Sequence, residues 1–208
     1  MSKEITKEEA KKLVIELASA STRTIIGIVG KPGGGKSTLS RFLLKGMDLS
    51  LVSVVPMDGF HLSNKVLKEL GKSDRKGAQD TFDVKGFTTL IARIKSDGTD
   101  PIYYPVFDRS IEESIAAQGV VYPSTRVVIV EGNYLMHDRD GWQEVAPLLD
   151  LSWYAFLDED LRISRLISRH IAFGKDPESA KAWAKGSDQV NAELIETGVA
   201  RCDFLIRT

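Results

Sequence analysis

Only one of the 208 residues is a cysteine, Cys202, so no disulfide within the chain can stabilise the fold. A chain of this length can instead bury roughly 70% of the surface that its unfolded form exposes, which is enough for a hydrophobic core without cross-links. Scarce cysteine fits a reducing compartment, and we expect a cytoplasmic protein. Cys202 itself is expected to be an ordinary residue near the last strand.

The sequence also lacks a long apolar run and an excess of charge of one sign. No uninterrupted apolar segment is long enough to span a bilayer. Charged residues, among them Lys3 and Glu4, precede any apolar run, so we expect neither a signal peptide nor a membrane anchor. The formal net charge of -1 gives no broad electrostatic reason to expect a nucleic-acid partner. No repeat, low-complexity tract or linker divides the chain, and we expect one domain over residues 1–208.

The most informative feature that is present is a glycine-rich segment at residues 30–38. Its sequence, GKPGGGKST, matches the pattern G-x-x-x-x-G-K-[ST], which wraps the phosphates of a nucleotide. An apolar run at 25–29 predicts a buried strand before it, and apolar spacing after it predicts a helix. Glycines let successive backbone N–H groups point at an anion, and the helix adds the positive end of its dipole. The alternative is a glycine-rich surface turn, which the strand and helix on either side argue against.

Each residue of this motif has an expected role. Lys36 is the point charge for the β- and γ-phosphates, and the Ser37 hydroxyl is the expected ligand of a bound Mg²⁺. The expected nucleotide-binding residues are Gly30, Gly33, Gly34, Gly35, Lys36, Ser37 and Thr38.

Helix patterns alternate with short apolar strands along the rest of the chain, which is typical of a parallel sheet covered on both faces. We expect an irregular segment at 57–84, helices at 6–20, 36–46, 86–96, 111–117, 159–173 and 177–196, and strands at 24–29, 51–56, 102–106, 126–130, 151–157 and 203–207. Ligands of open α/β sheets bind at the carboxyl ends of the strands, so the residues just after each strand are candidate site residues.

Two carboxylates follow expected strands. Asp58 is placed to deprotonate a hydroxyl, although an Asp-Gly turn is the alternative interpretation. Glu131 is the candidate carboxylate on the metal side, and otherwise an acid that caps the next turn. His61 either touches substrate or is a polar residue of its loop.

An expected helix at 159–173 is rich in arginine. Arg162, Arg165 and Arg169 stand at i, i+3 and i+7 and therefore share one face. Such a face could close over phosphates, where an arginine can contribute about 10³ to 10⁵ in rate. The alternative is a solvated helix face that begins with acidic residues.

Several segments together resemble one superfamily over nearly the whole chain. They are residues 30–38, 57–61, 75–83, 104–109 and 131–134. This ordered set is similar to the P-loop kinases that include uridine kinase, phosphoribulokinase and bacterial pantothenate kinase. It is most similar to their nucleoside or sugar kinase-like branch, which includes fructose transport system kinases.

The resemblance implies a P-loop NTPase fold, a three-layer α/β sandwich with a parallel sheet and a helical lid at about residues 158–185. It implies that Asp58 is the catalytic aspartate, that Glu131 is the acid after the Walker B strand, and that Arg165 or Arg169 is a lid arginine. It also implies acceptor contacts from His61, Tyr104, Asp108, Arg109 and Asn191.

We therefore expect an enzyme that transfers the γ-phosphoryl group of ATP, with Mg²⁺, to an alcohol group of a sugar, nucleoside or pantothenate-like metabolite. The acceptor stays open because the sequence departs from two members. Gly77 stands where uridine kinase offers a ribose-binding aspartate, and residues 105–109 lack the histidine of pantothenate kinase. A homodimer is compatible with this expectation.

Two other functions share the phosphate-binding loop. A regulatory GTPase or ATP-driven switch is one, and residues 138–141 do spell D-x-x-G. They lie several residues beyond their strand, however, and no Asn-Lys-x-Asp guanine reader is present. The other is a nucleotide-binding module without kinase activity, for example a partner of a transport system.

Overall fold

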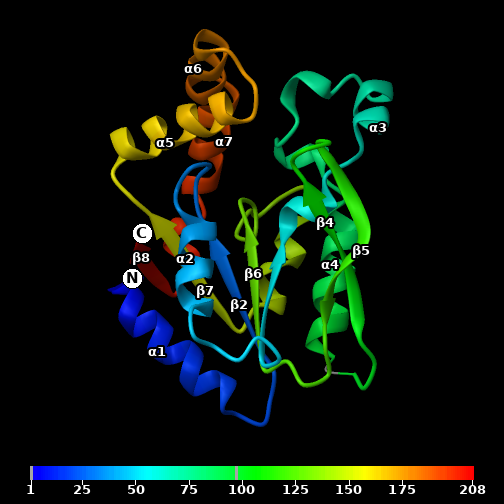
Figure 1. Cartoon of the computed structure of the whole chain (residues 1–208), viewed down its shortest axis with the longest axis vertical. Helices are drawn as coiled ribbons and strands as arrows, with labels where there is room; N and C mark the ends of the chain where they lie inside the picture. The colour runs from blue at the N-terminus through cyan, green and yellow to red at the C-terminus, as the bar shows by residue number, and fades with distance from the viewer. Residues whose placement is uncertain (1, 97) are drawn as a thin grey trace.

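A six-stranded parallel sheet forms the centre of the computed structural model, which describes residues 2–96 and 98–208. The strand order is β1-β8-β7-β2-β6-β3 (Figure 1). The strands are β1 Lys3–Ile5, β2 Thr24–Val29, β3 Val52–Pro56, β6 Val127–Gly132, β7 Leu151–Phe156 and β8 Phe204–Arg207. The sheet contains five of the six strands expected from the sequence, and adds β1 at the edge.

Helices cover both faces of this sheet because its central strands are apolar on both sides. Helices α1 (Lys7–Ala18) and α2 (Lys36–Leu44) pack on the face that carries Ile26 and Ile28. Helix α4 (Val84–Lys95) packs on the opposite face, against Ile25 and Val128. The expected three-layer α/β architecture is confirmed.

Three helices lie beyond the carboxyl ends of the strands, at the top of Figure 1: α5 (Glu159–Ala172), α6 (Pro177–Lys185) and α7 (Ser187–Glu196). The single helix expected at 177–196 is wrong, since the helix breaks at Gly186. That residue adopts φ -100 and ψ -101, and its N–H closes α6 by bonding to the carbonyls of Ala182 and Trp183. Because the chain changes direction at this break, α6 and α7 are two separate helices beyond the carboxyl ends of the strands.

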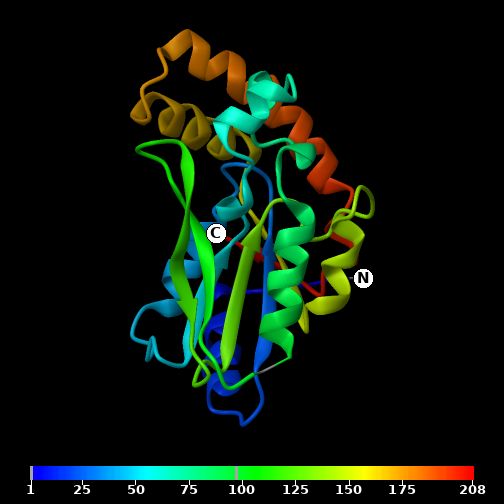
Figure 2. The same ribbon diagram turned by 90° about the vertical axis from the view of Figure 1, so that its right-hand side faces the viewer.

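Strands β4 (Ile102–Asp108) and β5 (Glu113–Val121) form an antiparallel hairpin outside the main sheet (Figure 2). The helix expected at 111–117 is wrong, and so is the placement of 102–106 in the parallel sheet. Cross-strand pairing overrides the helix propensity of Glu and Ala in this segment, with Ile115 opposite Val106. Gly119 lies under the ring of Tyr104, where a Cβ atom would come within 2.2 Å of a ring carbon.

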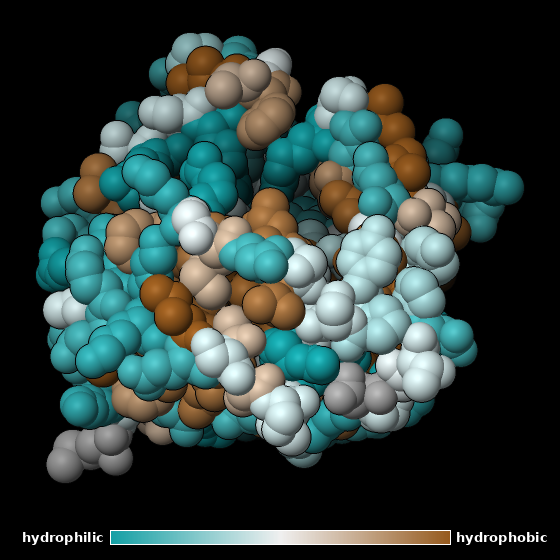
Figure 3. Space-filling view, turned by 60° about the horizontal axis from the view of Figure 1, so that its bottom comes forward, coloured by the Kyte–Doolittle hydropathy of each residue, from teal (hydrophilic) through white to brown (hydrophobic). Residues whose placement is uncertain are grey.

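The segment expected to be irregular, 57–84, contains 3₁₀ turns, the short helix α3 (Asn64–Glu69) and an isolated bridge between His61 and Phe82, and α4 begins at its last residue. Cys202 is buried beside the last strand, and burial raises the pKa of its thiol to about 12. Within residues 2–96 and 98–208, no helix combines the length and hydrophobicity that crossing a membrane requires. On the face shown in Figure 3, hydrophilic and apolar side chains are mixed in small groups.

Candidate active site

A cleft of about 580 Å³ opens at the carboxyl ends of the strands, beneath the helices α5 to α7. It is lined by the glycine-rich loop, by the turn after β3, by the end of β6, by the β4–β5 hairpin and by the lid helices. The structure brings together these residues expected from the sequence: Gly33, Gly34, Gly35, Lys36, Ser37, Thr38, Asp58, His61, Arg109, Glu131, Arg165, Arg169 and Asn191.

The glycine-rich loop connects β2 to α2 through conformations that favour glycine. Gly33 and Gly35 have φ of 76 and 88, and a Cβ atom at Gly35 would collide with the Thr208 side chain. Helix α2 begins at Lys36 with no side chain capping its first turn. Its first N–H groups are therefore available to an anion in the cleft.

The ammonium group of Lys36 lies inside this loop. Its Nζ donates to the carbonyls of Gly30 and Lys31 at 2.8 and 3.2 Å and to Oδ1 of Asn133 at 2.6 Å. Burial lowers the pKa of Lys36 to about 8, although the nearby carboxylates of Glu131 and Asp58 oppose the shift. Gly30 thus contributes its carbonyl to Lys36 and does not line the cleft. Asn133, which the sequence analysis does not assign, positions the lysine from the end of β6.

Glu131 binds the first turn of α2 through both of its oxygens. Ser37 Oγ donates to Oε1 at 2.5 Å, and Ser40 Oγ donates to Oε2 at 2.9 Å. A hydroxyl and a carboxylate side by side suit a hard cation such as Mg²⁺, which takes one or two protein oxygens and completes its shell with phosphate oxygens and water. The residues present therefore fit the expected metal, which Ser37 and Glu131 would hold.

Asp58 stands across the cleft from the loop, in a 3₁₀ turn at Met57–Phe60. Its Oδ2 accepts from Nη2 of Arg109 at 2.8 Å. Gly59 allows this contact, because a Cβ atom there would lie 2.0 Å from the carbonyl oxygen of Pro105. The hairpin that carries Arg109 can therefore press directly against the turn that carries Asp58.

His61 lines the cleft between two aromatic rings. It packs edge-on against Phe82 and Phe107, with ring centroids 4.1 and 4.9 Å away. Burial lowers its pKa to about 4, so the ring is neutral at pH 7. Its Nδ1 has no hydrogen-bond partner among the residues that the structure describes.

The three arginines of α5 do not all line the cleft. Arg165 and Arg169 line the cleft, and neither forms an ion pair within the described part of the chain. Burial, reinforced by the charge of Arg109, lowers the pKa of Arg169. Arg162 is instead buried at the foot of the helix and lies outside the cleft.

Two residues that the resemblance implies as acceptor contacts lie elsewhere. Tyr104 is buried, and its hydroxyl donates to the Val54 carbonyl at 2.8 Å. Asp108 accepts from the backbone and hydroxyl of Ser110 at the hairpin turn. Neither lines the cleft. Nor does the D-x-x-G segment at 138–141.

The cleft also contains residues that sequence reasoning missed. His170 and Asp188 face each other from α5 and α7, with Nε2 2.7 Å from Oδ2. Lys76, Phe107, Phe173 and Trp183 complete the acceptor side and the lid side. Asp188 lies three residues before Asn191, and Lys76 and Phe107 lie within the segments 75–83 and 104–109 that carry the resemblance. His170, Phe173 and Trp183 carry no such signal and become visible only in three dimensions.

Known proteins resemble the chain in sequence and in fold. The model of the phosphoribulokinase / uridine kinase family matches residues 25–183. A Schizosaccharomyces pombe protein named "Putative uridine kinase C227.14" is 31% identical over 206 residues, which cover 93% of this chain and 86% of that protein. A pantothenate kinase from Enterococcus faecalis is 34% identical over 141 residues, which cover 65% of this chain and 45% of that enzyme.

A solved structure shares the fold at higher identity. It is the crystal structure of a "putative fructose transport system kinase" from Silicibacter sp. TM1040, which is 36% identical with a TM-score of 0.85. The match covers 97% of this chain and 98% of that one.

Proposed function

Because this chain belongs to the phosphoribulokinase and uridine kinase family, we propose that it transfers the γ-phosphoryl group of ATP to an alcohol group of a small metabolite. One observation carries the proposal. Lys36, in a loop built to hold phosphates, and Asp58, a carboxylate on another wall, line the same cleft. A phosphoryl donor and a hydroxyl acceptor placed between them would meet end to end, which is the geometry that phosphoryl transfer needs.

The side chains divide the work of this reaction. Asp58 orients the acceptor hydroxyl and takes its proton as the oxygen attacks the γ-phosphorus. The bond from that phosphorus to the β–γ bridging oxygen breaks, and ADP leaves. Lys36 and the lid arginines Arg165 and Arg169 stabilise the charge on the transferring group. A Mg²⁺ ion held by Ser37 and Glu131 would neutralise charge on the β- and γ-phosphates.

Several side chains of the cleft bear on the acceptor, which we assign to the sugar, nucleoside or pantothenate-like class. On the acceptor side, His61 and Phe107 offer aromatic surface, and Lys76 and Arg109 offer positive charge. Phe107 lies under both cations, at 5.0 Å from Lys76 Nζ and 5.8 Å from Arg109 Cζ. We place Asn191 there too, because α7 carries it into the cleft.

A screen with radiolabelled ATP over sugars, nucleosides, vitamins and hydroxy acids tests activity and acceptor together. We expect label in one class of acceptor, dependent on Mg²⁺, and lost in Asp58→Asn. Running the same screen with labelled GTP identifies the preferred donor. If no acceptor takes label although ATP binds, the kinase proposal fails.

A nucleotide-binding module without kinase activity is the second candidate. The ion pair between Asp58 and Arg109 favours it, because the guanidinium occupies the carboxylate oxygen Oδ2 that an acceptor hydroxyl would need. Such a module would bind ATP normally and phosphorylate nothing in the screen, and Asp58→Asn would leave all its properties unchanged.

A further inference from the structure

Arg162 joins three parts of the molecule through one side chain. It is 1% exposed, and Nη1 donates to the Pro32 carbonyl of the phosphate loop at 2.9 Å. Within α5, Nε and Nη2 donate to the Glu159 carboxylate at 3.0 and 2.5 Å. Nη2 also donates to Oε1 of Gln189, in α7, at 2.6 Å. The loop, the first turn of α5 and the first turn of α7 are therefore held by one buried guanidinium.

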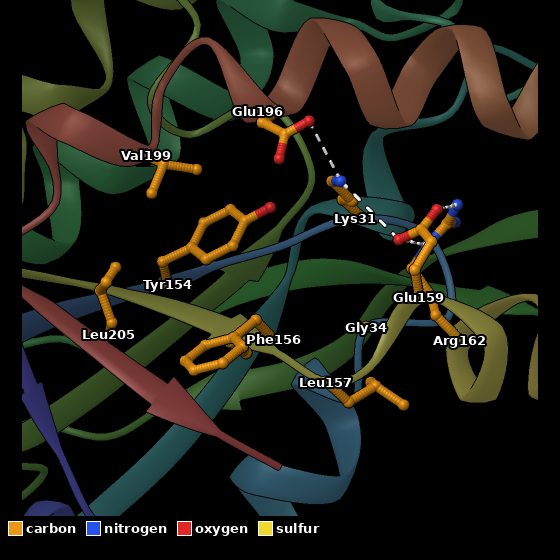
Figure 4. Close-up of a pocket in the computed structure, with 11 residues that line it drawn as sticks. Lys31, Gly34, Tyr154, Phe156, Leu157, Glu159, Arg162, Glu196, Val199 and Leu205 are labelled. Atoms are coloured by element: carbon orange, nitrogen blue, oxygen red, sulfur yellow. Dashed lines mark hydrogen bonds and ion pairs between the residues drawn. The ribbon is translucent and has the colours of Figure 1, made fainter.

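Lys31 of the same loop also connects the loop to α5 and α7, through ion pairs. Its Nζ lies 3.8 Å from Glu159 and 3.2 Å from Glu196 at the end of α7, as Figure 4 shows. Backbone packing adds a third link, because a Cβ atom at Gly33 would lie 2.9 Å from the Arg162 carbonyl oxygen. The outer side of the phosphate loop thus rests on both helices.

The connection matters because α7 also reaches the cleft. Asp188 and Asn191, on either side of Gln189 in the sequence, line it, and Asp188 faces His170 of α5. A buried guanidinium keeps its geometry tightly, since each lost partner leaves a desolvated charge without compensation. A shift of the Pro32 carbonyl would therefore be transmitted to Gln189 and from there to the residues beside it.

We propose that Arg162 is a positioning residue that couples occupancy of the phosphate loop to the placement of α7 and the lid. The inference rests on the proposed nucleotide binding and not on the identity of the acceptor. Nucleotide in the loop then biases the position of Asp188 and Asn191 in the same cleft.

Trp183 provides the readout, because it lines the cleft from α6 while Trp142 and Trp153 are fully buried. We expect MgATP to change the Trp183 emission of the wild-type protein. Gln189→Leu should bind MgATP within about threefold of wild type by calorimetry but lose at least about half of the emission change. Gln189→Glu, which keeps an acceptor oxygen for Arg162, should retain that change. Val190→Ala, at an exposed neighbouring position, is the matched control.

Three results would decide against the coupling or against its premise. A full emission change in Gln189→Leu overturns it, and so does a wild-type protein that binds MgATP with no change at all. A wild-type protein that binds no MgATP overturns the proposed function instead. Arg162→Lys gives a second variant: it keeps a cation but cannot reach all three partners, and it should lose the emission change like Gln189→Leu.

Discussion

Arg109 and Asp58 form an ion pair inside the cleft, with Nη2 2.8 Å from Oδ2. Both side chains are partly solvated, at 43% and 38% exposed, and the guanidinium also lies 5.8 Å from the rings of Phe107 and Phe173. Partly exposed pairs are weak, so an acceptor can compete for either partner. In the proposed reaction, the arginine would hold the carboxylate until an acceptor hydroxyl takes its position.

Replacing Asp58 by Asn tests the assignment of the base. The amide keeps the size of the side chain but cannot take a proton, so turnover should fall by roughly 10² to 10⁴. The affinity for ATP should stay close to that of wild type. Steady-state kinetics at saturating acceptor, with calorimetry for ATP, measure the two effects, and unchanged turnover would remove Asp58 from this role.

The affinity for ATP should weaken as the pH rises through about 8. Lys36 has a pKa lowered to about 8 from its ordinary value, so its ammonium loses its proton above that pH and no longer attracts the phosphates. Binding at pH 9 should then take up a proton, which calorimetry in buffers of different ionisation enthalpy detects. Lys36→Arg, charged at every accessible pH, should show no such uptake, and Lys36→Ala should bind ATP weakly throughout.

The same shift makes a prediction for stability. The charged form of Lys36 is disfavoured in the folded protein, so the unfolded chain binds more protons between pH 8 and the ordinary lysine pKa. The free energy of unfolding contributed by this residue should therefore rise with pH across that window. Denaturant titrations at pH 7.5 and pH 10 measure how much the free energy of unfolding changes between the two pH values in wild type and in Lys36→Met. An equal change in both proteins would contradict the lowered pKa.

Glu131→Gln should raise the Mg²⁺ concentration needed for half-maximal activity by about 10- to 100-fold. The amide still accepts from Ser37 and Ser40 but carries no charge for the cation. Ser40→Ala is the matched comparison: it leaves the carboxylate in place, and its effect should be the smaller one. A Glu131→Gln enzyme with the metal dependence of wild type would exclude Glu131 as a ligand.

Gly59→Ala should destabilise the fold by about 1–3 kcal/mol, because its Cβ atom would collide with the backbone of Pro105. The hairpin would move away from the turn that carries Asp58, and activity should fall with stability. Gly98→Ala is the control, since a Cβ atom there meets nothing within 4 Å. Thermal unfolding followed by circular dichroism measures both variants. Equal midpoints would show that the backbone at Pro105 moves to accommodate the Cβ atom without loss of stability.

The parts of the site that follow from local spacing could be predicted from the sequence. The glycine motif specifies its own loop, and strand ends place Asp58 and Glu131 at one edge of the sheet. What failed depends on contacts between distant segments. Residues 111–117 have helix-forming composition, yet from Glu113 onward they belong to β5, because that strand pairs with β4.

The direction of individual side chains is the other feature that could not be predicted from the sequence. The spacing of Arg162, Arg165 and Arg169 correctly predicts a helix, but the phosphate loop and α7 enclose the first of them and leave the others facing the cleft. Tyr104 likewise lies in the predicted strand, yet its hydroxyl bonds to Val54 because the hairpin packs onto the turn after β3. Neither outcome is encoded in local periodicity.

The β4–β5 hairpin is held together by its own ladder and joins the central sheet through no backbone pairing within the described residues. It delivers Phe107, Arg109 and Glu112 to the cleft, whereas the loop and α2 deliver the phosphate ligands. In the proposed reaction, part of the acceptor site would therefore come from a unit outside the sheet that carries the phosphate loop. We expect exchanges in the hairpin that keep Arg109 to alter the choice of acceptor, while the phosphate loop and α2 keep their sequence.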